Sequence, residues 1–127
     1  MIRPIRWIRC LLIPLLLATS SSAVAMTGNE LLQACKQVMQ NTDVEFASAG
    51  RCIGYLEGGR DGLSFAMYIL RQLKPGESSK YCVPNEVTNG QMARVVVKYL
   101  ESNPARLHEQ SLNLLLFAMI EAFPCGR

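Results

Sequence analysis

Apolar side chains in the first part of the chain after residue 26 recur at spacings of three and four residues, which is the pattern of a helix with one buried face. Thr27 and Glu30 stand at the start of this segment with the spacing of a capping box, in which the two residues satisfy each other's backbone groups. We expect a helix that begins there and ends at Asn41 and Thr42. Its repeating apolar positions are Leu31, Leu32, Cys35, Val38 and Met39.

A second capping box, Thr42 to Glu45, precedes another apolar face, which continues through residues 46–56. Gly50 and Gly54 lie inside this helix, and we interpret them as sites of close helix packing. The glycine-rich run 58–62 is expected to break or kink the helix. A further helical face over residues 63–73 should stop before Pro75, because proline disfavours helix in the residue that precedes it.

A third capping box, Thr88 to Gln91, opens the next helix. Val95, Val96 and Val97 alone would suit a strand, but the surrounding apolar positions follow the helical period. Asn103 and Pro104 have the residue types of an N-cap and a first helical position, so we expect a last helix over residues 105–123. The whole pattern predicts an all-α protein, a compact bundle of four to five short helices.

The first residues have the order of a cleavable signal peptide. Arg3, Arg6 and Arg9 form a cationic region, an apolar stretch follows at residues 11–17, and small residues surround Ala25. We expect cleavage between Ala25 and Met26, so that residues 1–25 are the signal and residues 26–127 form one exported domain. The apolar stretch is shorter than the roughly twenty residues of a membrane-spanning helix, so no membrane attachment is expected after cleavage.

Removal of this segment changes both the charge and the cysteine count. The chain has 13 Lys and Arg against 10 Asp and Glu, and the loss of three arginines makes the remaining domain formally neutral. No electrostatic argument for nucleic-acid binding remains. Cys10 leaves with the signal, and the four other cysteines predict two disulfides in an oxidising compartment, with all three pairings open. They are Cys35, Cys52, Cys82 and Cys125.

Candidate chemistry is sparse. His108 is the single histidine, and the cysteines lack the short spacing of a zinc site, so we predict no metal, cofactor or catalytic residue. Glu57 and Asp61 lie four positions apart and could serve as an acid and base pair, but an ion-pair face with Arg60, or a cap for the helix after Gly62, is the stronger interpretation. A binding loop over residues 76–85 remains, and we expect Tyr81 to be exposed there. Its candidate partner-binding residues are Ser78, Ser79, Lys80, Tyr81 and Asn85.

Several short segments around the cysteines together resemble the Rap/Tai family of type VI secretion immunity proteins. These segments are Cys52-x-Gly54-Tyr55-Leu56-x-Gly58, Cys82-Val83-Pro84, Val97-Lys98-Tyr99-Leu100 and Ala122-Phe123-Pro124-Cys125. The resemblance implies a periplasmic helical protein, often a homodimer, that binds a peptidoglycan amidase effector and blocks its active-site cleft. It implies no catalytic residues of the protein's own.

A second resemblance concerns the helical unit between two cysteines, which is similar to small periplasmic acid-stress chaperones. That similarity would favour the pairing Cys52–Cys82 together with Cys35–Cys125. Against this alternative function, a dimer that dissociates in acid usually has an interface rich in titrating groups, whereas the domain carries one histidine and ten acidic residues. The immunity function is therefore the leading prediction, the chaperone is the alternative, and an enzyme using Glu57 and Asp61 ranks last.

Overall fold

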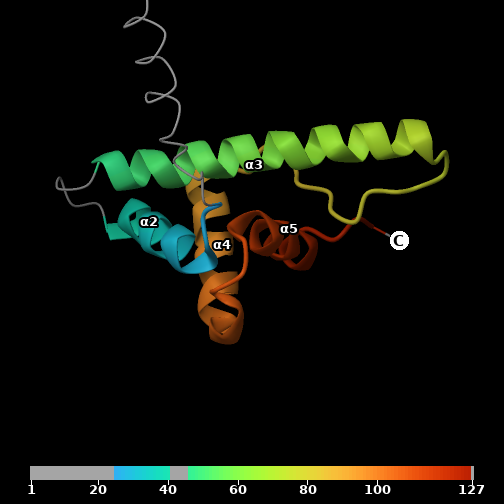
Figure 1. Cartoon of the computed structure of the whole chain (residues 1–127). Helices are drawn as coiled ribbons and strands as arrows, with labels where there is room; N and C mark the ends of the chain where they lie inside the picture. The colour runs from blue at the N-terminus through green and yellow to red at the C-terminus, as the bar shows by residue number, and fades with distance from the viewer. Residues whose placement is uncertain (1–24, 41–45, 127) are drawn as a thin grey trace, which may run out of the picture.

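The computed structural model describes residues 25–40 and 46–126. These residues form α2 (Gly28–Gln40), α3 (Phe46–Leu73), α4 (Asn89–Ser102), the short 3-10 helix η1 (Pro104–Arg106) and α5 (Ser111–Ala122). α3 lies along one side of the molecule, α4 runs crosswise to it, and α2 and α5 lie beneath it on either side of α4 (Figure 1). Only two isolated bridges, and no strand, occur among the described residues, so the predicted all-α class is confirmed.

One hydrophobic core joins the four α-helices. Its largest fully buried apolar side chains come from every α-helix: Leu31, Cys35, Cys52, Leu56, Val96, Leu100, Leu114, Leu115 and Met119. Complete burial of one leucine or methionine side chain stabilises a fold by roughly 1.5–3 kcal/mol. The core lies under the first half of α3, and the second half extends beyond it (Figure 1).

Of the predicted capping boxes that fall on described residues, the one at Thr27 forms in both directions, and at Thr88 the hydroxyl half forms. The Glu30 carboxylate accepts from the Thr27 backbone N–H at 2.7 Å, and the Thr27 hydroxyl accepts from the Glu30 N–H at 3.4 Å. The Thr88 hydroxyl accepts from the Gln91 N–H at 3.2 Å, which caps α4. The remaining box, at residues 42–45, lies outside the described residues, as does almost all of the expected signal peptide at residues 1–25.

The predicted break at residues 58–62 is wrong, because α3 continues through the glycines as one helix of 28 residues. Each interior glycine costs only about 1 kcal/mol relative to alanine, which the helical turns on both sides can sustain. Gly59 has a packing reason, since a Cβ there would lie 2.6 Å from Leu115 Cδ2. The prediction that Gly50 and Gly54 allow close packing against another helix of this chain is also wrong, because a Cβ at either position would meet no atom within 4 Å.

The last helix begins later than predicted. Asn103 precedes only the three-residue η1, and a turn separates η1 from α5, which starts at Ser111. The chain is interrupted there because its N-terminal segment docks onto the turn. The backbone N–H groups of Gly28 and Asn29 donate to the carbonyls of Glu109 and Leu107 at 3.0 and 2.9 Å.

Two disulfides staple the bundle, as predicted, but the pairing implied by the chaperone similarity is wrong. Cys35 of α2 bonds to Cys52 of α3 with their Cα atoms 5.0 Å apart, and Cys82 bonds to Cys125 with a Cα separation of 4.8 Å. A disulfide needs Cα atoms within about 7 Å. Antiparallel packing of α2 on α3 provides that proximity for the first pair, and the return of the α3–α4 loop to the C-terminus provides it for the second.

Candidate functional site

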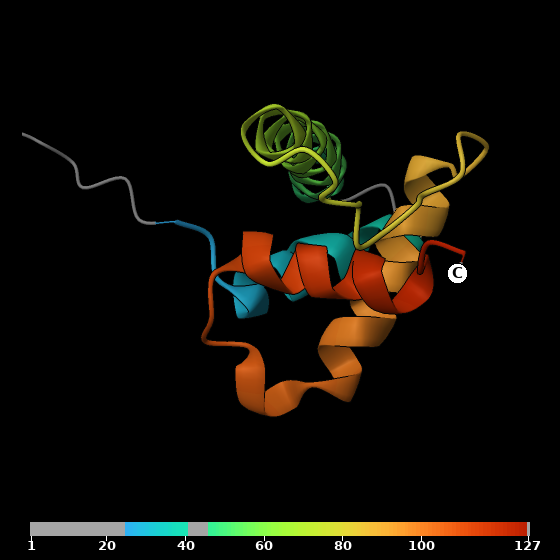
Figure 2. The ribbon, with the colours of Figure 1, turned by 90° about the vertical axis from the view of Figure 1, so that its right-hand side faces the viewer.

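The loop between α3 and α4, residues 74–88, is anchored to the C-terminal end of the chain. It leaves α3 through Gly76, whose φ of 98° lies in the left-handed region that favours glycine. The Cys82 backbone N–H donates to the Phe123 carbonyl at 2.8 Å, beside the Cys82–Cys125 disulfide. Figure 2 shows the loop descending from the end of α3 and passing the end of α5. The loop is therefore fixed at its middle, not only at its two ends.

Most of the predicted partner-binding residues lie at the loop surface. Ser78, Lys80 and Asn85 are exposed, and Ser79 is half-buried with its hydroxyl donating to the Tyr81 carbonyl at 2.7 Å. Lys80 Nζ lies 3.5 Å from a carboxylate oxygen of Glu77, an exposed ion pair of little energetic weight. The structure therefore brings these four polar side chains together on one loop.

The expected exposure of Tyr81 is wrong, because the side chain is 7% exposed and belongs to the core cluster. The backbone at Tyr81 forms an isolated antiparallel bridge with Pro124, which directs this residue inward. Its hydroxyl is buried and has no hydrogen-bond partner among the described residues. This burial has no local signal in the sequence, because it depends on the bridge to Pro124.

A cleft of about 350 Å³ separates the second half of α3 from this loop. The loop side includes Ser79, Tyr81 and Asn85. The helix side consists of Arg60, Ser64, Met67, Tyr68 and Arg71. Sequence reasoning missed this cleft because it placed a break at residues 58–62, which would have separated Arg60 from the helical face that carries Arg71.

A second surface feature runs along another side of α3. Gly54, Gly58 and Gly62 follow each other at four-residue spacing, and a Cβ on any of them would meet no atom within 4 Å. They line a shallow hollow of about 320 Å³ together with Tyr55, Gly59 and Leu112. Farther along the same side, Phe65 and Ile69 are 66% and 39% exposed. A groove and two apolar side chains thus share one exposed face of α3.

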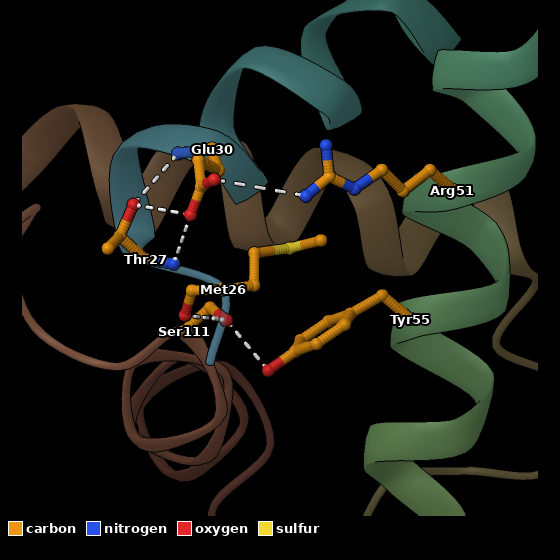
Figure 3. Close-up of polar contacts among 6 residues, drawn as sticks. All are labelled: Met26, Thr27, Glu30, Arg51, Tyr55 and Ser111. Carbon is orange, nitrogen blue, oxygen red and sulfur yellow. Dashed lines mark hydrogen bonds and ion pairs between the residues drawn. The ribbon is translucent and has the colours of Figure 1, made fainter. Parts of the chain in front are cut away.

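A polar cluster connects the N-terminal segment to α3 and α5 (Figure 3). Ser111, which is fully buried, lies 2.7 Å from both the Met26 carbonyl oxygen and the Tyr55 hydroxyl. The backbone N–H of Thr27 donates to Glu30 and holds the pKa of that carboxyl below its ordinary value. Arg51 Nη2 lies 4.0 Å from the same glutamate. The cluster fixes the chain immediately after the expected cleavage site.

The residues weighed for catalysis occupy ordinary structural positions. Glu57 accepts a hydrogen bond from Asn89 Nδ2 at 2.5 Å, which links α3 to the start of α4. Asp61 and His108 are both exposed. In residues 25–40 and 46–126, no group of three or more His, Cys, Asp or Glu side chains is arranged to hold a metal ion. No helix in this part of the chain is long and apolar enough to cross a membrane.

Comparison with known proteins gave one family. Residues 27–125 match the family model described as Rap1a immunity proteins. The match covers all the described helices and all four disulfide-bonded cysteines. Comparisons with curated proteins and with solved structures found no match.

Proposed function

This chain belongs to the Rap1a immunity protein family, and from that premise we propose that it is exported to the periplasm, where it binds and occludes a peptidoglycan amidase effector of type VI secretion. Membership of an immunity family implies an effector protein as the partner. The observation that carries the proposal is the family match over residues 27–125. The two disulfides add support for an exported protein, because such bonds persist in oxidising compartments.

The proposed mode of action is steric, with no catalytic step of the protein's own. Family membership supports a protein that acts by binding. Glu57, one of the two carboxylates weighed for catalysis, instead links two helices through its hydrogen bond with Asn89. The surface proposed to meet the effector is the exposed part of the α3–α4 loop around Ser78 and Lys80. Its anchoring by Cys82–Cys125 supports this choice, because a loop ordered before binding loses less conformational entropy in the complex.

The decisive experiment measures binding and inhibition with a purified type VI amidase effector from the organism that makes this protein. We expect a stoichiometric complex at neutral pH and loss of amidase activity on purified peptidoglycan. Ser78→Arg should weaken the complex without unfolding the domain, since Ser78 is exposed. Gln33→Arg, at an exposed position on α2, is the matched control and should bind normally. An amidase that remains fully active with excess protein would contradict the proposal.

Export has its own test. We expect the periplasmic form to begin at Met26, because Ala25 ends the expected signal and the Met26 carbonyl is already held by Ser111. Mass spectrometry of the periplasmic protein reads this terminus directly. Retention of residues 1–25 in the periplasmic fraction would contradict the assigned cleavage site.

We further propose that a second copy of the chain covers the exposed face of α3, giving a homodimer. A two-fold interface requires a self-complementary surface. An antiparallel pairing centred near Asp61 would place Phe65 of each copy over Gly58 of its partner, and Ile69 over Gly54. The exposure of both apolar side chains and the open space at both glycines support this register.

Light scattering over a range of concentrations tests the dimer. We expect the wild-type protein to have the mass of two chains, and Phe65→Asp and Gly58→Leu each to shift it toward one chain, because one buries a charge and the other fills the groove. Lys98→Asp, at an exposed position on α4, should leave the mass unchanged. A wild-type protein that stays monomeric at high concentration would overturn the pairing.

A further inference from the structure

We infer that the cleft between the second half of α3 and the α3–α4 loop binds an extended acidic peptide segment of a protein partner, with Arg60 and Arg71 each receiving a carboxylate. This inference rests on the proposed function only in assigning that segment to the effector. The chemistry of the cleft is a property of this chain alone. The cleft also faces a different side of α3 from the Gly54, Gly58 and Gly62 groove, so a dimer through that groove would leave it open.

The charge of the cleft is unbalanced. Neither Arg60 nor Arg71 forms an ion pair among the described residues, whereas Arg51, Arg106, Lys36 and Lys80 each have a carboxylate partner there. None of the residues that line the cleft is an Asp or a Glu. A cleft with two unpaired guanidinium groups and no acidic wall attracts a negatively charged ligand.

The nearby acidic side chains on α3, Glu57 and Asp61, form no ion pair with these arginines among the described residues. Glu57 is engaged by Asn89 on the adjoining helix. Asp61 is the residue after Arg60 and so projects about 100° away from it around the helix. The two arginines therefore remain available to a carboxylate from outside, and a guanidinium binds a carboxylate through two parallel hydrogen bonds.

The spacing of the arginines selects an extended peptide. They lie eleven positions apart on one continuous helix, which is close to three turns, so both point to the same side. Their Cα atoms are separated by about 16 Å along the helix axis. An extended chain advances about 3.3 Å per residue and its side chains alternate between two faces. Two carboxylates six residues apart therefore lie on one face and span about 20 Å, which the two long arginine side chains can bridge.

The wall between the arginines suits the rest of such a segment. Met67 and Val83 offer apolar contact from the helix and the loop, respectively. The Tyr81 side chain also lines the cleft, but its hydroxyl is buried. Ser79 and Asn85 offer neutral polar groups from the loop in addition to the two charges.

A titration followed by nuclear magnetic resonance tests the inference on the periplasmic form of the protein. The probe is the synthetic peptide acetyl-Glu-Ser-Ala-Ser-Ala-Ser-Glu-amide, and its control has glutamine in place of both glutamates. We expect saturable shifts of the backbone amides around Arg60, Arg71 and Tyr81 with the acidic peptide, and at least about tenfold weaker binding of the glutamine peptide. Equal binding of the two peptides, or no saturable shift, would overturn the inference.

Variants locate the interaction. Arg60→Gln combined with Arg71→Gln should abolish the shifts. Arg94→Gln is the matched control, because Arg94 is an exposed arginine of α4 without an ion pair among the described residues. Binding of the acidic peptide that survives in the double variant would place it elsewhere and overturn the cleft assignment.

The same double variant separates this inference from the proposed function. An amidase effector that binds it as tightly as the wild type would overturn the assignment of the acidic segment to the effector and leave the immunity function intact. If no amidase binds the wild type while the acidic peptide does, the cleft inference stands and the immunity function is contradicted. If the double variant binds neither the acidic peptide nor the amidase, the result supports both the cleft inference and the immunity function.

Discussion

The Tyr55 hydroxyl and the Ser111 Oγ lie 2.7 Å apart, and their hydrogen bond joins the middle of α3 to the first residue of α5. Ser111 Oγ also lies 2.7 Å from the Met26 carbonyl oxygen. A serine hydroxyl has one proton, so Ser111 donates to the carbonyl and accepts from the tyrosine. Three segments from distant parts of the chain therefore meet at one fully buried hydroxyl.

Ser111→Ala should destabilise the fold. The substitution removes the partner of the Tyr55 hydroxyl and one of the two donors to the Met26 carbonyl, which keeps its bond from the residue 111 backbone N–H at 2.9 Å. Leaving a buried polar group without its partner costs about 1–3 kcal/mol. Tyr55→Phe removes one hydrogen bond and should cost about 1 kcal/mol. Urea unfolding measures both free energies. A midpoint for Ser111→Ala equal to that of the wild type would show that the cluster does not contribute to stability.

The two disulfides should differ in their response to mild reduction. Cys35 and Cys52 are both fully buried, whereas Cys82 is exposed, so a thiol reagent reaches the Cys82–Cys125 bond first in the native protein. Alkylation of the released thiols, followed by mass spectrometry, identifies which cysteines react. Early labelling of Cys35 or Cys52 would contradict this order.

Replacement of each pair by alanine gives a second measure of the same bonds. The cysteines lie 17 positions apart in one pair and 43 in the other. Loop-closure entropy then predicts losses of about 3 kcal/mol for Cys35–Cys52 and about 4 kcal/mol for Cys82–Cys125. Thermal unfolding of the two double variants tests these values, and melting temperatures equal to the wild type would contradict the entropic account.

The sequence predicted those features that local chemistry determines. The helix caps at Thr27 and Thr88 depend on residues three positions apart, and at both the threonine hydroxyl accepts from the backbone N–H three positions on, as predicted. The continuity of α3 through its glycines depends instead on packing, since Leu115 of a distant helix occupies the space beside Gly59. Neither that contact nor the docking of residues 26–29 on the turn before α5 has a local signature.

The candidate site shows the same division between local and distant causes. The composition and boundaries of the α3–α4 loop were evident from Pro75, Gly76 and Cys82. The burial of Tyr81 was not, because it results from a bridge to Pro124, more than forty residues away. The cleft follows from this bridge and from the unbroken α3, so it too depended on contacts that the sequence pattern does not show.

Acidification should destabilise the fold in part through Glu30 and Glu109. The pKa of Glu30 is lowered because its carboxylate accepts from the Thr27 backbone N–H, and that of Glu109 is lowered by its hydrogen bonds with Arg106. The pKa of a glutamate in the unfolded chain is about 4.3. A carboxyl whose pKa is lower in the folded state stabilises the fold fully above this unfolded-state pKa. That stabilisation is lost as the pH falls through the folded-state pKa. Glu30→Gln should therefore show a smaller drop in melting temperature between neutral and acidic pH than the wild type does. An identical pH profile for the variant would remove Glu30 from this explanation.

Two glycines of α3 should respond to alanine with opposite signs. At Gly50 an added Cβ meets no atom within 4 Å, so Gly50→Ala should stabilise the helix by about 0.5–1 kcal/mol, since alanine loses less backbone entropy there. At Gly59 the Cβ would lie 2.6 Å from Leu115 Cδ2, and overpacking typically costs about 1–3 kcal/mol. Both positions lie inside the same helix, so helix propensity is matched between them. Chemical unfolding of the two variants measures the difference directly. Stabilisation by both substitutions would mean that the core yields at Leu115, whereas destabilisation by both would mean that a contact outside this chain covers Gly50.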